Sequence, residues 1–163
     1  MLTQEGGYTQ QLITAMINLV PGFGNLATER TVPALAAIYF FVAFIGSSSL
    51  SAAGLAATTK EMDLNHPRAQ QASLSGLPLR LKSAHLNMVE NFPAFALSAA
   101  LVHTIAPTNQ HLINLLGFFV LNKTFVYWPA YVTNVAPARS ASHLVSMASL
   151  LQVFYLLAKD GGK

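Results

Sequence analysis

Long, mostly apolar stretches without charge alternate with short polar segments along this chain. No Lys, Arg, Asp or Glu lies within residues 31–59, 91–122 or 140–158. A transmembrane helix needs about 20 consecutive, predominantly apolar residues. The pattern therefore predicts four membrane-spanning helices. They cover about residues 32–58, a second span that begins near residues 78–84 and ends before Pro107, residues 111–134, and a fourth span from the turn at 135–140 to about residue 158.

The predicted helices are joined by connections of very different lengths. The second and third are separated only by "PTNQ", and the third and fourth by "VAPARS", whereas the polar segment "TKEMDLNHPRAQQASLSG" follows the first. Short connections make consecutive helices antiparallel neighbours. The expected fold class is thus all-α, an integral membrane bundle of four helices in up-down order.

The first thirty residues have a different pattern. Residues 8–20 are expected to form a short amphipathic or interfacial helix, which Pro21, Gly22 and Gly24 end. The start "MLTQEGGYTQQ" lacks the basic region of a secretory signal. We therefore divide the chain into an N-terminal extension, residues 1–30, and a domain of four transmembrane helices, residues 31–160.

Composition supports a bilayer as the main solvent. The 163 residues are 53% hydrophobic and 9% charged, against about 25% charged in an average soluble domain. The net charge of +3 includes no basic run, so no nucleic-acid partner is expected. The chain has no cysteine to act as a ligand or nucleophile, and the spacing of its histidines does not suggest a metal site.

The distribution of cations predicts an orientation. Five cations lie at the end with the long loop, and three lie at the opposite end: Lys60, Arg68, Arg80, Lys82 and Arg139 against Arg30, Lys159 and Lys163. Because cytoplasmic loops carry an excess of Lys and Arg, the long loop is expected in the cytosol and both termini on the other side. The predicted location is the endoplasmic reticulum or another endomembrane in a eukaryote, or the inner membrane in a bacterium.

Polar residues form one stripe on each of the last three helices, all toward the cytosolic half. The stripes are Ser83, Asn87, Glu90 and Ala94; Lys123, Tyr127, Tyr131 and Asn134; and Arg139, Ser142, His143 and Ser146. Charged groups inside a membrane nearly always face the bundle interior or a wet cavity. The stripes are consistent either with a hydrated functional cleft or with an ion pair in which Glu90 clamps Lys123 or Arg139.

Two segments resemble a known family. They are "NHPR" followed by "LSGLPLRLKSAHLNMVENFPAF", and "FVYWPAYVTNVAPARS", which opens the last helix. With the four-span pattern they resemble the membrane-associated proteins in eicosanoid and glutathione metabolism (MAPEG), over about residues 32–158. The resemblance implies a homotrimer with active sites between subunits near the cytosolic face. It also implies glutathione as co-substrate and a lipophilic small molecule from the membrane as second substrate.

The resemblance implies roles for individual residues. Arg139 is expected to be the catalytic cation that stabilises the thiolate, while Asn87 and Glu90 bind glutathione. The other expected glutathione contacts are Lys123, Tyr127, Tyr131, Ser140 and His143. Two positions depart from the pattern: Ser83 replaces an arginine that many members carry, and Lys123 replaces an arginine that some carry in the third helix.

The expected function is that of a membrane-bound glutathione transferase or peroxidase, acting on lipophilic electrophiles or lipid hydroperoxides. One alternative is a non-enzymatic lipid-binding or scaffold protein of the same family, which the missing arginine at Ser83 favours. A proton-linked transporter that uses Glu90 is a weaker alternative, because four spans do not show the internal repeat of such folds.

Overall fold

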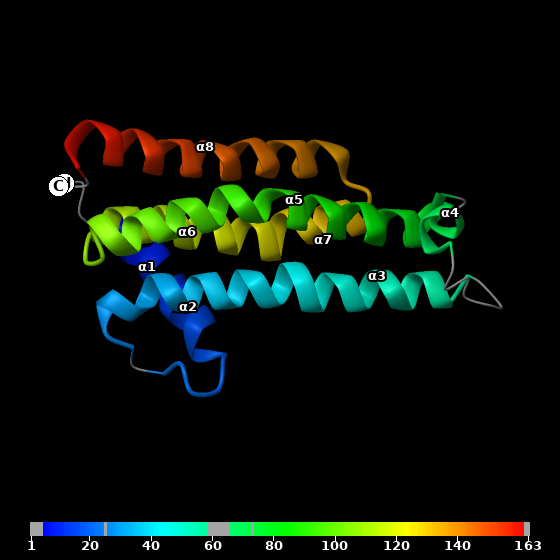
Figure 1. Ribbon diagram of the computed structural model, residues 1–163, viewed down its shortest axis with the longest axis horizontal. Helices are drawn as coiled ribbons and strands as arrows, with labels where there is room; N and C mark the ends of the chain where they lie inside the picture. The colour runs from blue at the N-terminus through cyan, green and yellow to red at the C-terminus, as the bar shows by residue number, and fades with distance from the viewer. Residues whose placement is uncertain (1–4, 25, 59–65, 73, 162–163) are drawn as a thin grey trace.

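The computed structural model describes residues 5–24, 26–58, 66–72 and 74–161, and these residues form helices joined by turns, with no strand among them (Figure 1). The elements are α1 (Glu5–Asn18), α2 (Thr28–Phe40), η1 (Phe41–Gly46), α3 (Ser47–Ala56), α4 (Pro67–Ala72), α5 (Gly76–Ile105), α6 (Gln110–Asn122), η2 (Lys123–Tyr127), α7 (Trp128–Val132) and α8 (Ala136–Asp160). The segments η1 and η2 are π-helical turns within otherwise continuous helices.

Four long helical segments lie side by side and alternate in direction (Figure 1). They are α2–η1–α3, α5, α6–η2–α7 and α8. The beginning of α2 and the end of α8 lie at the same end of the molecule, and the short helix α4 lies at the other (Figure 1). The expected all-α class is confirmed for the described residues.

Three of these segments are long and apolar enough to cross a membrane: Thr28–Ala56, Gly76–Ile105 and Ala136–Lys159. The segment α6–η2–α7 was also expected to span, yet it is not among the three. Its interior carries Asn114, Asn122 and Lys123, which lower its mean hydropathy. Asn122 and Lys123 are buried against protein, which is where polar side chains in a membrane are tolerated.

The short connections have residues suited to their backbone geometry. The Asn109 side chain accepts a hydrogen bond from the Leu112 backbone N–H at 3.1 Å and so caps the start of α6. Asn134, just beyond α7, has a φ of 64°, a left-handed conformation that asparagine tolerates better than most residues. Pro137 then lies in the first turn of α8, where a missing N–H has no cost.

An aromatic cluster joins three of the long segments at the core. The Tyr39 ring lies 4.9 Å from that of Phe95 and 5.1 Å from that of Phe119, centroid to centroid. The Phe95 and Phe119 rings stack at 5.1 Å. The Tyr39 hydroxyl donates to the carbonyl of Met88 at 3.1 Å, so the only polar atom of this buried ring is satisfied.

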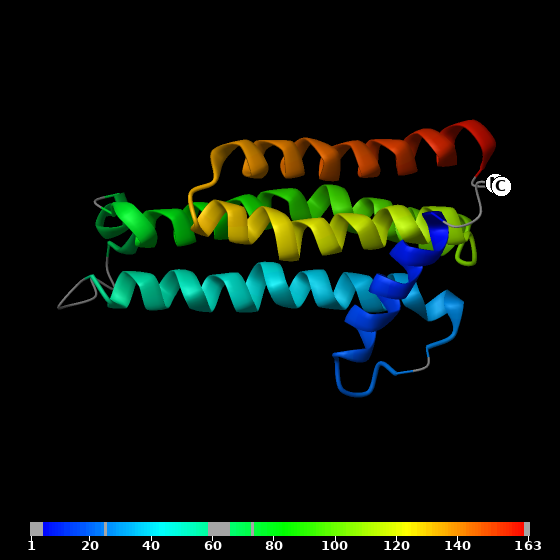
Figure 2. The ribbon, with the colours of Figure 1, turned by 180° about the vertical axis from the view of Figure 1, so that it is seen from behind.

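The N-terminal helix begins and ends slightly earlier than expected, and it packs onto the bundle. It crosses α6 obliquely near the end where α2 begins (Figure 2). Ile13, Met16 and Ile17 are buried on the face toward the bundle. A Cβ at Gly117 of α6 would overlap Cδ1 and Cγ1 of Ile13. The absence of a side chain at Gly117 therefore allows α1 to approach this closely.

Gly117→Ala is expected to loosen α1 without unfolding the four long segments. The added methyl overlaps the buried Ile13 side chain, and overpacking of this kind typically costs about 1–3 kcal/mol. Amide hydrogen exchange across residues 5–18 should become faster. The double variant Ile13→Ala/Gly117→Ala removes the overlap and should exchange more slowly than Gly117→Ala alone. Unchanged exchange in Gly117→Ala would contradict this account.

Candidate functional site

A polar surface cavity lies among α5, η2, α7 and the first turns of α8. The end of α7 and the start of α8 lie toward the end of the molecule that carries α4 (Figure 1). The volume of the cavity is about 370 Å³. It is lined by Asn87 of α5, Tyr127 and Tyr131 of the third segment, and Arg139, Ser140, His143 and Leu144 of α8. We call it the polar cavity. Helices from three parts of the chain thus contribute to one site.

The π-helical turn η2 contributes Tyr127 to the polar cavity. It begins at Lys123 and ends at Tyr127, and π-turns of this kind occur frequently at functional sites. The Lys123 side chain is fully buried, and its Nζ lies 4.0 Å from the centre of the Tyr127 ring. This cation–π contact places positive charge directly behind the ring that lines the cavity.

Lys123 also contacts His143 across the helix interface. The Lys123 Nζ and His143 Nδ1 lie 3.0 Å apart. A protonated lysine has donors and no acceptor, so His143 Nδ1 accepts from it. The remaining ring nitrogen of His143 then carries the proton and is a donor. His143 lines the polar cavity. The contact with Lys123 therefore favours the tautomer of His143 whose other ring N–H can donate a hydrogen bond to a ligand there.

Arg139 provides a second positive charge at the polar cavity. The centre of its guanidinium lies 4.6 Å from the centre of the Tyr131 ring. No carboxylate lines the cavity, and Arg139 makes no ion pair with any described residue. The guanidinium is thus held by an aromatic face and retains its donors for a ligand. A cavity with these charges is suited to an anion.

Asn87 is oriented by a neighbour on its own helix. The Asn91 side-chain amide donates to Asn87 Oδ1 at 2.9 Å and also to the Asn87 backbone carbonyl. Asn91 is buried, whereas Asn87 is half-buried and lines the polar cavity. With its oxygen engaged in this way, Asn87 presents its amide N–H groups as free donors. Asn91 was not among the expected site residues, although its i, i+4 spacing from Asn87 was a usable signal.

Glu90 was expected to bind glutathione, and it lies on the surface of α5 near the polar cavity. It is exposed and does not line the polar cavity. It forms no ion pair within 4.0 Å with Lys123, Arg139 or another described residue. The structure therefore does not contain the Glu90 clamp that the sequence left open. Lys123 does not line the cavity either, because its contacts with His143 and Tyr127 hold it in the interior.

Two further contacts hold the helices around the polar cavity in register. The Asn122 side chain donates to the carbonyl of Ser142 at 2.7 Å and to Ser146 Oγ at 2.8 Å. Arg80 Nε donates to the carbonyl of Val132 at 2.8 Å, at the end of α7. The first contact fixes α6 to α8, and the second fixes α5 to α7. Arg80, which lies about one helical turn before the half-buried Ser83, is thereby engaged with α7.

The structure brings together six of the eight expected site residues: Asn87, Tyr127, Tyr131, Arg139, Ser140 and His143. Lys123 contacts two of them from the interior, and Glu90 is exposed on the same stretch of α5, where its charge acts on Tyr127. Residues missed by sequence reasoning are Asn91, Asn122 and Leu144. The described residues contain no group of three or more side chains arranged to hold a metal ion.

The described residues form helices, three helical segments among them are long and apolar enough to cross a membrane, and a cavity at one end carries a cationic side chain. These features are those of a helical membrane protein. The chain belongs to the MAPEG family, whose family model matches residues 32–159. The match covers all four long segments apart from the first residues of α2 and the last residue of α8, and α1 lies outside it. No curated protein and no solved structure matches the chain significantly.

Proposed function

We propose that this protein is a membrane-bound glutathione transferase or peroxidase that acts on lipophilic electrophiles or lipid hydroperoxides. Glutathione binds in the polar cavity, which faces the cytosol in an up-down bundle of four transmembrane helices. Family membership supports this class of reaction. The observation that carries the proposal is the lining of the cavity, where Arg139 and five polar side chains meet without a carboxylate.

The donor set fits an anionic peptide. Glutathione has two carboxylates and a thiol. Asn87 and the tyrosine hydroxyls supply neutral hydrogen-bond donors, and His143 supplies the ring N–H that Lys123 favours. Arg139 would then be free to stabilise the thiolate, which is the reactive form of the thiol. In conjugation the thiolate sulfur bonds to the electrophilic carbon, either by addition to an activated double bond or by displacing a leaving group that departs to solvent, and the thiol proton passes to solvent or to the adduct. In the peroxidase reaction two glutathione thiols supply the two electrons: the O–O bond of the hydroperoxide breaks, the alcohol and water form, and the two sulfurs become glutathione disulfide.

The proposal includes a homotrimer with the polar cavity between subunits. The open cavity and the exposed Glu90 beside it support this arrangement. A neighbouring subunit that covered this face would turn an open surface into a cleft, and Glu90 would then face the ligand or the neighbour. The lipophilic substrate would reach the same cleft from the bilayer.

A calorimetric titration of the purified, detergent-solubilised protein with glutathione tests the proposal. We expect saturable binding by the wild type and about fivefold weaker binding by Asn87→Ala, since one hydrogen bond contributes about 1 kcal/mol. Asn114→Ala is the matched control, because Asn114 is bonded to Gln110 near the opposite end. Absence of binding to a well-folded wild type would refute glutathione as the co-substrate.

A non-enzymatic lipid-binding protein is the second candidate. Ser83 leaves its stretch of α5 without the cation that many members carry, and an apolar groove lies elsewhere on the molecule. If the protein is a non-enzymatic lipid-binding protein, the calorimetric titration with glutathione should give no heat of binding. Lipid binding should then be the same in the wild type and in Glu90→Gln. The glutathione titration therefore separates the two candidates.

A further inference from the structure

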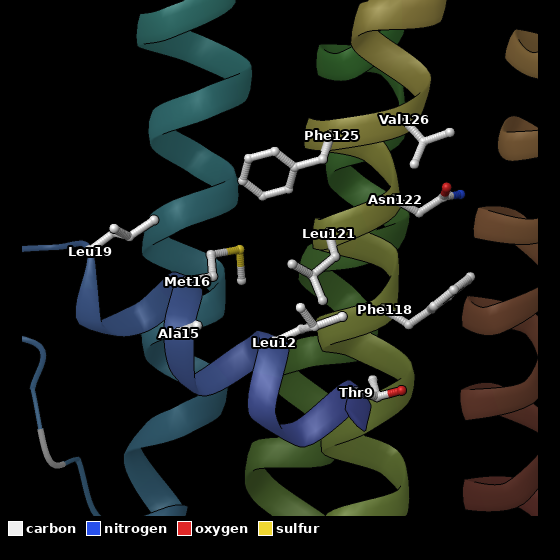
Figure 3. Close-up of a pocket in the computed structure, with 10 residues that line it drawn as sticks. All are labelled: Thr9, Leu12, Ala15, Met16, Leu19, Phe118, Leu121, Asn122, Phe125 and Val126. Carbon is white, nitrogen blue, oxygen red and sulfur yellow. The ribbon is translucent and has the colours of Figure 1, made fainter. Parts of the chain in front are cut away.

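A second cavity lies on the outer side of the bundle, between α1 and the segment α6–η2 (Figure 3). Its volume is about 560 Å³, within the range of small-molecule sites. The residues that shape it are Leu12, Met16 and Leu19 of α1 with Leu121, Phe125 and Val126 of α6 and η2. We call it the α1 groove. No charged residue lines it, so its chemistry excludes an ionic ligand.

The α1 groove is formed by a part of the chain outside the family match. The match begins at residue 32, whereas α1 ends at Asn18. Close contact between Ile13 and Gly117 holds α1 against α6, so the groove is formed without a ligand. It shares no lining residue with the polar cavity. Asn122 lines the α1 groove, and the adjacent Lys123 contacts His143 at the polar cavity.

The two sides of α1 differ in polarity. On the side away from the α1 groove, a smaller cavity of about 260 Å³ has several polar lining residues, namely Gln10, Thr14, Asn18, Thr28, Thr31 and Gln110. Three of these belong to the first turns of α2 and α6, at one end of the bundle. The helix α1 thus separates polar surface at that end from apolar surface farther along α6.

This separation matches the boundary between headgroups and hydrocarbon. Interfacial helices lie at that boundary with one apolar side. The α1 groove then lies at hydrocarbon depth, beside the middle of the segment α6–η2–α7. Leu12 is 59% exposed, Leu19 78% and Phe125 57%, and in a bilayer lipid chains are the solvent for such side chains. An apolar occupant supplied by the membrane fits this lining.

We propose that the α1 groove is a binding site for one acyl chain of a bilayer phospholipid. The acyl chain lies between α1 and α6–η2. The lipid headgroup stays outside the groove, at a depth in the membrane that the position of α1 determines. This site is separate from the glutathione site and does not depend on the proposed enzymatic activity. It identifies a role for the N-terminal helix that the family match does not include.

Lipid retention by the full-length protein tests the proposal. The protein is reconstituted with palmitoyl-oleoyl phosphatidylcholine, extracted into mild detergent and examined by native mass spectrometry. The wild type should retain one phospholipid per chain. Leu12→Asn places an amide in the groove without touching the core, and it should lower retention about tenfold, since burial of an unpaired amide costs about 1–3 kcal/mol. Leu151→Asn, at an exposed leucine of α8 outside the cavities, is the control and should retain the lipid.

Ala15→Trp gives an independent test, because Ala15 lines the α1 groove and a large ring there would fill it. We expect loss of the bound phospholipid, whereas Ala148→Trp on the exposed side of α8 should keep it. Equal retention in wild type, Leu12→Asn and Ala15→Trp would overturn the proposal. So would a change in oligomeric mass in Ala15→Trp with unchanged lipid content, which would identify the groove as a contact between copies of this chain.

Discussion

Replacing Arg139 with alanine is expected to lower kcat/KM for conjugation of glutathione to a small electrophile by about a hundredfold to a thousandfold. A loss of this size is usual when one group that stabilises the reacting charge is removed. Arg139 lines the polar cavity and makes no ion pair with a described residue, so its guanidinium is available to the thiolate. Steady-state kinetics in detergent or nanodiscs measures the loss.

The pH profile distinguishes this role from a structural one. A neighbouring cation favours the thiolate and lowers the pKa of the bound thiol, so wild-type activity should be high at neutral pH. In Arg139→Ala the thiol should ionise near its free value, about 8.5, and activity should be recovered only as the pH rises toward that value. Arg30→Ala, an exposed cation at the start of α2, is the control. Identical pH profiles for wild type and Arg139→Ala would exclude the proposed role.

Lys123→Met is expected to weaken glutathione binding while leaving the fold as stable as before or more stable. Lys123 is fully buried and makes no ion pair with a described residue. Replacing buried charge with an apolar side chain of similar size is often neutral or stabilising. His143 and Tyr127 nevertheless lose the positive charge behind them. We expect about tenfold weaker binding, equivalent to about 1.4 kcal/mol.

The two readouts are calorimetry with glutathione and thermal unfolding of the same preparation. Lys159→Met is a matched control, because Lys159 is exposed near the end of α8 and far along the helix from the polar cavity. A Lys123→Met variant with a lower Tm and unchanged affinity would reverse the expected pattern. In that case Lys123 would act as a structural group and not as support for the ligand site.

The helical segments were predictable because apolar runs and breaking residues are local properties. The expected second span, from residues 78–84 to just before Pro107, corresponds to α5 at Gly76–Ile105, which begins slightly earlier. The expected third span, 111–134, corresponds to helical residues 110–132. Asn109 and Pro137 mark helix starts by their own chemistry. The π-turns were not predicted, since an extra residue in a helical turn depends on packing against neighbouring helices.

Helical periodicity predicted which residues of the candidate site lie on the same face of one helix. Tyr127 and Tyr131 share a stripe, as do Arg139 and His143, and these four residues line the same cavity. Periodicity does not say which flank of a stripe a neighbouring helix covers. Glu90 and Asn91 lie about 60° and 40° to opposite sides of Asn87 around α5. Asn91 is buried, whereas Glu90 is exposed.

The sequence by itself determined the order of the helices, their approximate ends and the residues that share each polar stripe. These follow from backbone periodicity and from the cost of placing charge in hydrocarbon. Only the tertiary structure decided that Lys123 lies behind the polar cavity, that Glu90 forms no ion pair with a described residue, and that α1 packs against Gly117. The physical reason is that side-chain burial depends on which neighbouring helix covers each face, and residues far apart in the chain determine that together.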